Sequence, residues 1–114
     1  MSSIDRKEAL QRYKERKLTG GICAIRNLKT DKRLIFLDND LEAARNRFEF
    51  TSKSGVCASF KMQRDWNLQG AQDFVFEVIE HLEMKKDQTV AEFNEELKML
   101  EEMVKSRYEK KAMY

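Results

Sequence analysis

The sequence has 114 residues, no proline, four glycines, two cysteines and a single histidine. Two cysteines cannot build a disulfide framework, so the cytoplasm is the expected compartment. Cys23, Cys57 and His81 are scattered singly, whereas a zinc site needs three or four ligands, usually in close pairs. No apolar run approaches the roughly 18 residues that cross a bilayer, and the polar N-terminus does not resemble a secretory signal. We therefore expect no membrane partner and no small-molecule cofactor.

The net charge is small but unevenly distributed. The chain is 37% charged with a formal net charge of +2, which by itself argues against a dedicated nucleic-acid binder. Residues 1–70, however, carry 15 basic and 9 acidic side chains, whereas residues 71–114 carry 7 basic and 11 acidic. The chain therefore has a basic front and an acidic back.

The hydrophobic pattern predicts an α+β (α/β) domain with elements in the order α-β-β-α-α-β-α. The first 18 residues are typical of a charged helix that ends at Gly20-Gly21, and two short apolar runs, Ile22–Ile25 and Leu34–Leu37, suggest a β-hairpin. Asn39 with Glu42 resembles a capping box that starts a helix, and the composition of Thr51–Gly55 suggests a loop. The remaining predicted elements are a helix over Phe60–Gln69 capped by Gly70, a strand over Phe74–Ile79 and a long helix capped by Thr89 and Glu92, with Phe93, Leu97, Leu100, Val104 and Tyr108 on one face.

These elements predict a single domain over residues 1–114, with an N-terminal helical extension over 1–19 and a core over 20–105. The core would be a small, mostly antiparallel three-stranded sheet flanked by helices. Trp66 is expected to anchor the core rather than to stack on a base. For Met99 and Met103, core filling is the simpler interpretation, although methionines clustered late in the chain also suit an adaptable interface.

Five basic residues on two predicted helices and their connecting loop are candidates for contacts with DNA phosphates. They are Arg45, Arg47, Lys53, Lys61 and Arg64. If they converge, they would bind the backbone without reading bases. Because Glu49 and Asp65 are interleaved among them, an ordinary solvated surface is the preferred alternative.

The order and spacing of several motifs resemble the GIY-YIG nuclease superfamily over about residues 20–105. Gly21-Ile22-Cys23 looks like its first motif, and Lys32 to Phe36 like its second. Met62-Gln63-Arg64-Asp65-Trp66-Asn67 is similar to a Leu-Gln-x-x-Trp/Phe-Asn stretch. Leu100-Glu101-Glu102 resembles the helix that supplies a metal-binding glutamate. The resemblance implies the fold of a family that cleaves DNA with one divalent metal ion.

Carried over residue by residue, the resemblance leaves most of the active site substituted. The two motif tyrosines correspond to Cys23 and Leu34, the helix arginine to Ala44, and an early His or Lys to Cys57. Only Glu101 survives as a candidate catalytic and metal-binding carboxylate, with Arg45 as a replacement arginine one position, about 100°, out of register. Leu34 and Ala44 can neither move a proton nor stabilise negative charge. If the fold is right, Cys23 and Cys57 lie close together in the remodelled cleft.

The resulting prediction is a catalytically inactive, nuclease-like domain that binds DNA through residues 26–64, or a protein partner. The first alternative is a metal-dependent endonuclease with an atypical site, the only case in which Mg²⁺ is expected. The second alternative is a structural protein that forms a homodimer through its C-terminal or N-terminal helix.

Overall fold

The computed structural model of the protein describes residues 18–55 and 59–114. The predicted helix before residue 18 therefore lies outside the described residues. So does Cys57, whose predicted proximity to Cys23 is not tested. Within them, the element order β-β-α-α-β-α matches the prediction. No helix in the described part of the chain is long and apolar enough to cross a bilayer.

Three antiparallel strands form the sheet, in the order β2-β1-β3, which confirms the predicted fold class. They are β1 (Thr19–Asn27), β2 (Arg33–Asp38) and β3 (Phe74–Glu83). The central strand β1 is buried from Gly20 to Ile25. Because both of its faces are covered, β1 has a continuous apolar run instead of an alternating pattern.

The two adjacent glycines belong to β1 and not to a helix end, contrary to the sequence interpretation. A methyl group on Gly20 would lie 2.7 Å from the carbonyl oxygen of Asp38, and one on Gly21 would overlap the carbonyl oxygen of Glu80. Asp38 ends β2, and Glu80 is in β3. Both neighbouring strands therefore approach β1 more closely here than a side chain would permit.

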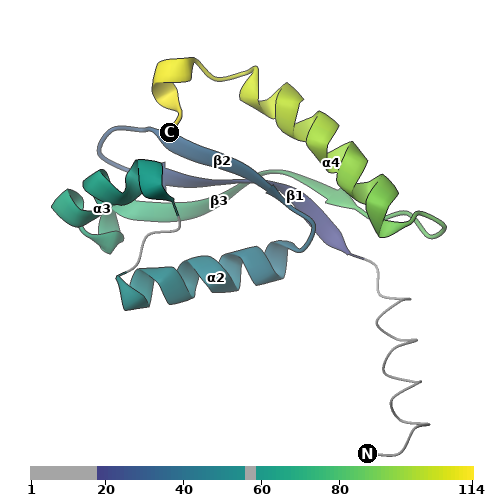
Figure 1. Ribbon diagram of the computed structural model, residues 1–114, viewed down its shortest axis with the longest axis horizontal. Helices are drawn as coiled ribbons and strands as arrows, with labels where there is room; N and C mark the ends of the chain where they lie inside the picture. The colour runs from purple at the N-terminus through teal and green to yellow at the C-terminus, as the bar shows by residue number, and fades with distance from the viewer. Residues whose placement is uncertain (1–17, 56–58) are drawn as a thin grey trace, which may run out of the picture.

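Helices cover the two faces of the sheet separately (Figure 1). The helix α4 (Val90–Lys105) packs on one face, and α2 (Leu41–Ser54) and α3 (Gln63–Gln69) pack on the other. Short 3-10 turns, η1 (Phe60–Met62), η2 (Ala71–Asp73) and η3 (Lys110–Ala112), join or follow them. The sheet thus lies between two helical layers, with α4 on one face and α2 and α3 on the other.

Each layer has its own core. On the α4 side, Ile22, Ala24, Ile35 and Val104 are buried together, and Phe93 and Leu97 confirm the predicted apolar face. On the α2 and α3 side, the core is Ile25, Met62, Trp66 and Phe74. Trp66 is therefore a core anchor, as predicted. Packed side chains continue through Tyr114, beyond the predicted core end at residue 105.

Several local predictions are wrong. Asp40, and not Asn39, caps α2, because its side chain accepts from the backbone N–H of Ala43. The predicted loop at Thr51–Gly55 is the last turn of α2, and Gly55 ends it with a φ of 76°. Met99 and Met103 do not fill the core, since they are 67% and 59% exposed.

Candidate functional site

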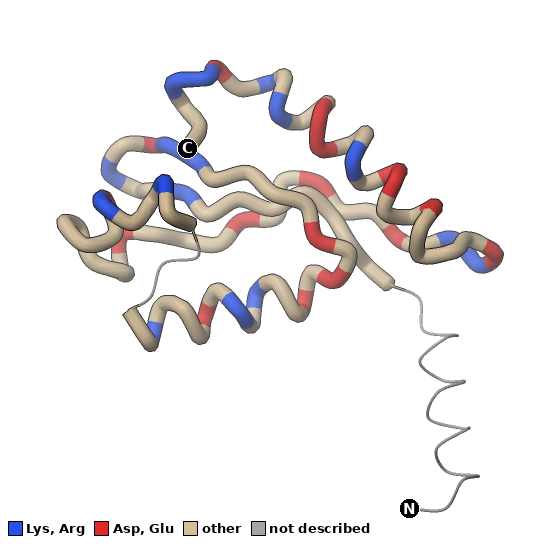
Figure 2. Tube along the Cα trace, in the orientation of Figure 1, with Lys and Arg blue, Asp and Glu red and all other residues tan. Residues whose placement is uncertain are grey.

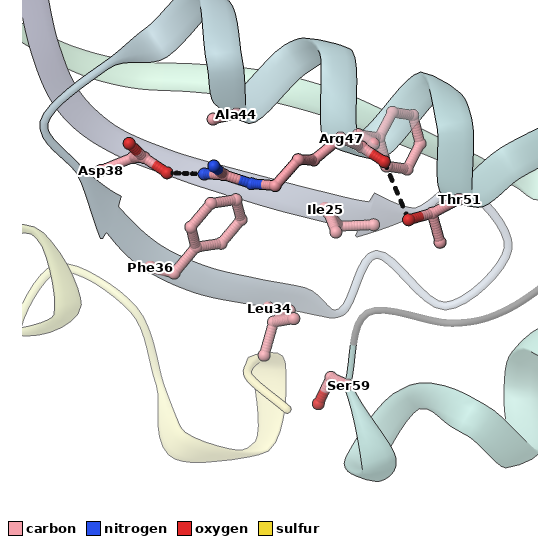
Figure 3. Close-up of a pocket in the computed structure, with 9 residues that line it drawn as sticks. Ile25, Leu34, Phe36, Asp38, Ala44, Arg47, Thr51 and Ser59 are labelled. Atoms are coloured by element: carbon pink, nitrogen blue, oxygen red, sulfur yellow. Dashed lines mark hydrogen bonds and ion pairs between the residues drawn. The ribbon is translucent and has the colours of Figure 1, made fainter.

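A pocket of about 540 Å³ lies between α2 and the strands β1 and β2 (Figure 3). Its floor and walls are mostly hydrocarbon, and its polar groups lie at the ends. The apolar lining residues are Ile25, Leu34, Phe36, Ala44 and Phe48, and the polar ones are Asp38, Arg47, Thr51 and Ser59. A hollow of this composition suits an apolar or planar group better than a hydrated ion.

One end of the pocket is closed by an ion pair between Asp38 and Arg47. The Asp38 carboxylate is mostly buried and also accepts from the backbone N–H of Asp40, 2.9 Å away. The Thr51 hydroxyl donates to the Arg47 carbonyl at 2.8 Å. This arrangement ties the end of β2 to the first half of α2 and compensates the charge of Arg47.

Two of the positions at which the motif resemblance expects catalytic side chains come together in this pocket. Leu34 enters from β2 and Ala44 from α2. Neither side chain has a group that could accept a proton or stabilise an anion. The structure thus brings together the positions that the motif resemblance links, and what they line is an apolar pocket.

Cys23 is fully buried in the centre of the sheet and is not among the pocket-lining residues. Burial raises the pKa of its thiol to about 11, and Asp38 adds to this effect, while Arg45 and Arg47 partly oppose it. The thiolate is the nucleophilic form of cysteine, so a protonated thiol at neutral pH is inert. The proximity of Cys23 to Cys57 stays a prediction, because Cys57 is not described.

Glu101 lies on α4, across the sheet from Ala44. Its neighbour on the helix is a cation, Lys105, at 3.7 Å. Mg²⁺ takes oxygen ligands and usually one or two carboxylates together with substrate phosphates. In the described ranges, no group of three or more His, Cys, Asp or Glu side chains is placed to hold a metal ion. Glu101 is therefore a lone carboxylate beside a lysine, and its role as a Mg²⁺ ligand stays a prediction.

The five predicted DNA-contacting residues do not form one surface. Arg45 stacks over the Phe76 ring, 5.6 Å from its centroid, and faces β3 instead of the pocket. Arg47 is held by Asp38. The remaining three, Lys53, Lys61 and Arg64, are exposed and have no ion pair with any described residue.

The arginines of the hairpin are also compensated. Arg26 and Arg33 both pair with the Glu77 carboxylate, at 3.3 and 3.1 Å, and Arg26 also pairs with Asp31. The positive charge predicted over residues 26–64 is therefore smaller than the count implies. The remaining positive charge lies at the end of the molecule that holds the β1–β2 turn and α3 (Figure 2).

At this end of the molecule, three side chains form a hydrogen-bonded chain that the sequence did not predict. The buried Asn27 side chain donates to the Tyr114 hydroxyl at 2.9 Å, which donates to Asp65 at 2.7 Å. Lys32 lies over the Tyr114 ring, 5.6 Å from its centroid. Burial raises the pKa of the Tyr114 phenol, and Asp65 adds to that shift. No local sequence signal marks these partners, because they are 49 to 87 positions apart.

Comparison with known proteins returns two solved structures. No family model matches the chain, and no curated protein matches it. The chain is similar to the catalytic domain of the homing endonuclease I-TevI, at 27% identity and a TM-score of 0.48 over 75% of this chain and 91% of that one. It is also similar to a mutant of the same domain, at 26% identity and a TM-score of 0.47 over 75% and 88% of the two chains. I-TevI is a GIY-YIG nuclease, the superfamily that the sequence motifs resemble.

Proposed function

We propose that this chain is a DNA-binding domain with a nuclease-like architecture and no phosphodiester-cleaving activity. The observation that carries the proposal is the pairing of Leu34 and Ala44 in one apolar pocket, at the positions where the motif resemblance expects a tyrosine and an arginine. Phosphodiester cleavage needs groups that move a proton and stabilise developing negative charge. Leucine and alanine supply neither function.

Binding is supported by three exposed cations on neighbouring segments of the chain. Lys53 is in the last turn of α2, Lys61 is in η1 and Arg64 is in α3. Arg64 lies one turn after Lys61. Uncompensated lysine and arginine side chains release counterions from DNA phosphates, and this release supplies affinity without sequence reading. The binding surface proposed here is therefore Lys53, Lys61 and Arg64, and it excludes Arg45 and Arg47.

The test measures binding and cleavage on the same protein. Affinity for a fluorescent duplex of about 20 base pairs is measured by anisotropy at several salt concentrations. The wild-type affinity should fall steeply with salt, and Lys61→Ala with Arg64→Ala should lower the magnitude of the log–log slope by about 2. Supercoiled plasmid with Mg²⁺ or Mn²⁺ should stay intact.

Lys98→Ala is the matched control, because Lys98 is an exposed lysine on α4, across the sheet. It should leave the salt dependence unchanged. Equal losses for the control and for the double variant would contradict the proposed surface. Plasmid nicking that is abolished by Glu101→Ala would instead establish the endonuclease alternative.

A further inference from the structure

The pocket between α2 and the sheet is built from two facing rows of side chains (Figure 3). On β2, Leu34, Phe36 and Asp38 are alternate residues and therefore share one face of the strand. On α2, the lining residues follow helical spacing and form one face of the helix; they are Ala44, Arg47, Phe48 and Thr51. Protein interiors rarely leave voids larger than a water molecule. A hollow of about 540 Å³ between a helix and its sheet has the size of a ligand site.

Two aromatic rings give the pocket flat apolar surface. Phe36 from β2 and Phe48 from α2 both line it, and both are half-buried. Other rings hold them in place, because each lies near the ring of Phe76, at centroid distances of 6.5 and 6.0 Å. Phe48 also meets the Trp66 ring edge-on at 6.4 Å. Partly exposed rings that are fixed by an aromatic cluster are suited to stacking with a planar ligand ring.

The polar end of the pocket carries both a hydrogen-bond acceptor and a donor. The Asp38 carboxylate binds the Arg47 guanidinium and the backbone N–H of Asp40, and its two oxygens have room for further hydrogen bonds. A guanidinium has five N–H groups, more than this ion pair uses. Because the pair is neutral and the mostly buried Asp38 is an anion, a phosphate group is a poor occupant. Nucleobases present donors and acceptors side by side along their edges, and they match this end without adding charge.

We propose, on the basis of the DNA binding proposed above, that the pocket takes one unpaired nucleobase of the bound DNA. Its ring lies against the two phenylalanines, and its polar edge lies at the ion pair. A base in an intact duplex is paired and stacked, so only a base that has left the stack can enter a pocket between a helix and a sheet. The protein therefore prefers DNA with an unpaired base over fully paired DNA.

A free nucleoside carries the same planar ring as a base within a strand. The strand is the favoured source, because the pocket adjoins a proposed phosphate contact. Ser59 lines the pocket, and its side chain accepts from the backbone N–H of Lys61 at 3.3 Å. A base that belongs to a strand places its phosphates where Lys61 can bind them, whereas a free nucleoside has no phosphate.

The test compares two fluorescent duplexes that are identical except for one unpaired base at the centre of one of them. Anisotropy at a single salt concentration gives the ratio of their affinities for the full-length chain. The wild type should bind the duplex with the unpaired base about tenfold more tightly, the scale of stacking one base on an aromatic side chain. Ala44→Leu fills the pocket from α2 and should bring the ratio close to one. Ala91→Leu is the matched control, since Ala91 is exposed on α4, and it should keep the wild-type ratio.

Two further variants separate the pocket from the phosphate contacts. Phe36→Leu keeps an apolar side chain but removes a ring, so it should lower the ratio without filling the pocket. Lys61→Ala with Arg64→Ala should weaken the binding of both duplexes in parallel and keep the ratio. Circular dichroism confirms that each variant is folded.

Each contrary outcome identifies what has failed. Equal wild-type affinity for the two duplexes would overturn the base pocket and leave the proposed DNA binding intact, and so would a preference that survives Ala44→Leu. A free nucleoside that binds as tightly as the duplex with the unpaired base would assign the pocket to a free ligand instead. If neither duplex shows salt-dependent binding, the proposed function fails and the base pocket fails with it.

Discussion

At the scale of single residues, the most consequential contact is the one made by Tyr114. Its hydroxyl accepts from the Asn27 amide and donates to the Asp65 carboxylate. Asn27 is fully buried, and its side-chain oxygen accepts from the backbone N–H groups of Lys29 and Thr30. The β1–β2 turn is therefore held from inside by a side chain that itself depends on Tyr114.

Tyr114→Phe should lower the free energy of unfolding by about 1–3 kcal/mol, because it leaves the buried Asn27 amide without an acceptor. Denaturant titration measures the change. Tyr108→Phe is the control, since the Tyr108 hydroxyl makes no hydrogen bond to the described residues, and its ring, which lies 5.3 Å from the Arg33 guanidinium, is retained. Equal stability of the two variants would show that the Asn27 bond contributes nothing.

The Cys23 thiol should make stability depend on alkaline pH. Its pKa is raised from 9.0 to about 11 in the folded chain, so the folded thiol holds its proton after the unfolded one has lost it. Stability is therefore complete below pH 9 and declines as pH rises from 9 to 11, by at most about 2–3 kcal/mol. The measurement compares the wild type with Cys23→Ala over this range. Parallel pH profiles for the two proteins would refute the assignment.

At the scale of elements, the start of α2 depends on one carboxylate. Asp40 has an extended backbone with a φ of −140°, and its side chain accepts from Ala43, 3.1 Å away. The neighbouring Asn39 instead donates to Asn94 of α4 at 3.2 Å. Asp and Asn are both good helix caps, but here Asp40 caps α2 and Asn39 links α2's start to α4.

Asp40→Ala should cost about 1 kcal/mol of stability, whereas Asp40→Ser should cost only a few tenths, because serine also caps helices well. Thermal or denaturant unfolding of the two variants provides the comparison. If Asn39 were the true cap, as the capping-box pattern predicts, the two substitutions at Asp40 would have the same small effect.

The type and order of the elements were predictable from the hydrophobic pattern. The ends of the helices, and the face that each helix buries, were not. The Thr51–Gly55 stretch has the composition of a loop, yet α2 continues to Ser54 because Gly55 supplies the left-handed cap. In the next helix, Phe60 and Leu68 are exposed while Met62 and Trp66 are buried. Met62 and Trp66 are four residues apart, as helical spacing requires, so the pattern gives the faces of this helix but not which of them is buried.

At the scale of the whole molecule, the sheet decides which predicted site residues meet. Leu34 and Ala44 reach the same pocket, as the motif resemblance implies. Glu101 is on the other layer, and Arg45 turns toward Phe76. A linear sequence gives the spacing of motifs but not the side of the sheet on which a distant helix packs. The metal role of Glu101 therefore stays a prediction.

The count of basic residues along the sequence overestimates the exposed positive charge for a related reason. The basic front of the sequence is partly neutralised by acids far along the chain, above all by Glu77, which holds Arg26 and Arg33. Of the five predicted contacts, Arg47 is ion-paired and Arg45 lies over the Phe76 ring, whereas Lys53, Lys61 and Arg64 have no ion pair in the described structure. The electrostatic surface is set by pairing across the sheet and not by the sum along the sequence.

The bond between Asn27 and Tyr114 spans 87 positions of sequence, and this separation has a consequence for synthesis. While the chain is being made, β1 and β2 are available long before Tyr114 is, so the hairpin must exist for a time with its central amide lacking that partner. Contacts of such long range form late, since chain entropy opposes their closure. The β1–β2 turn should therefore be the part of the sheet that becomes fixed only after Tyr114 is free to reach Asn27.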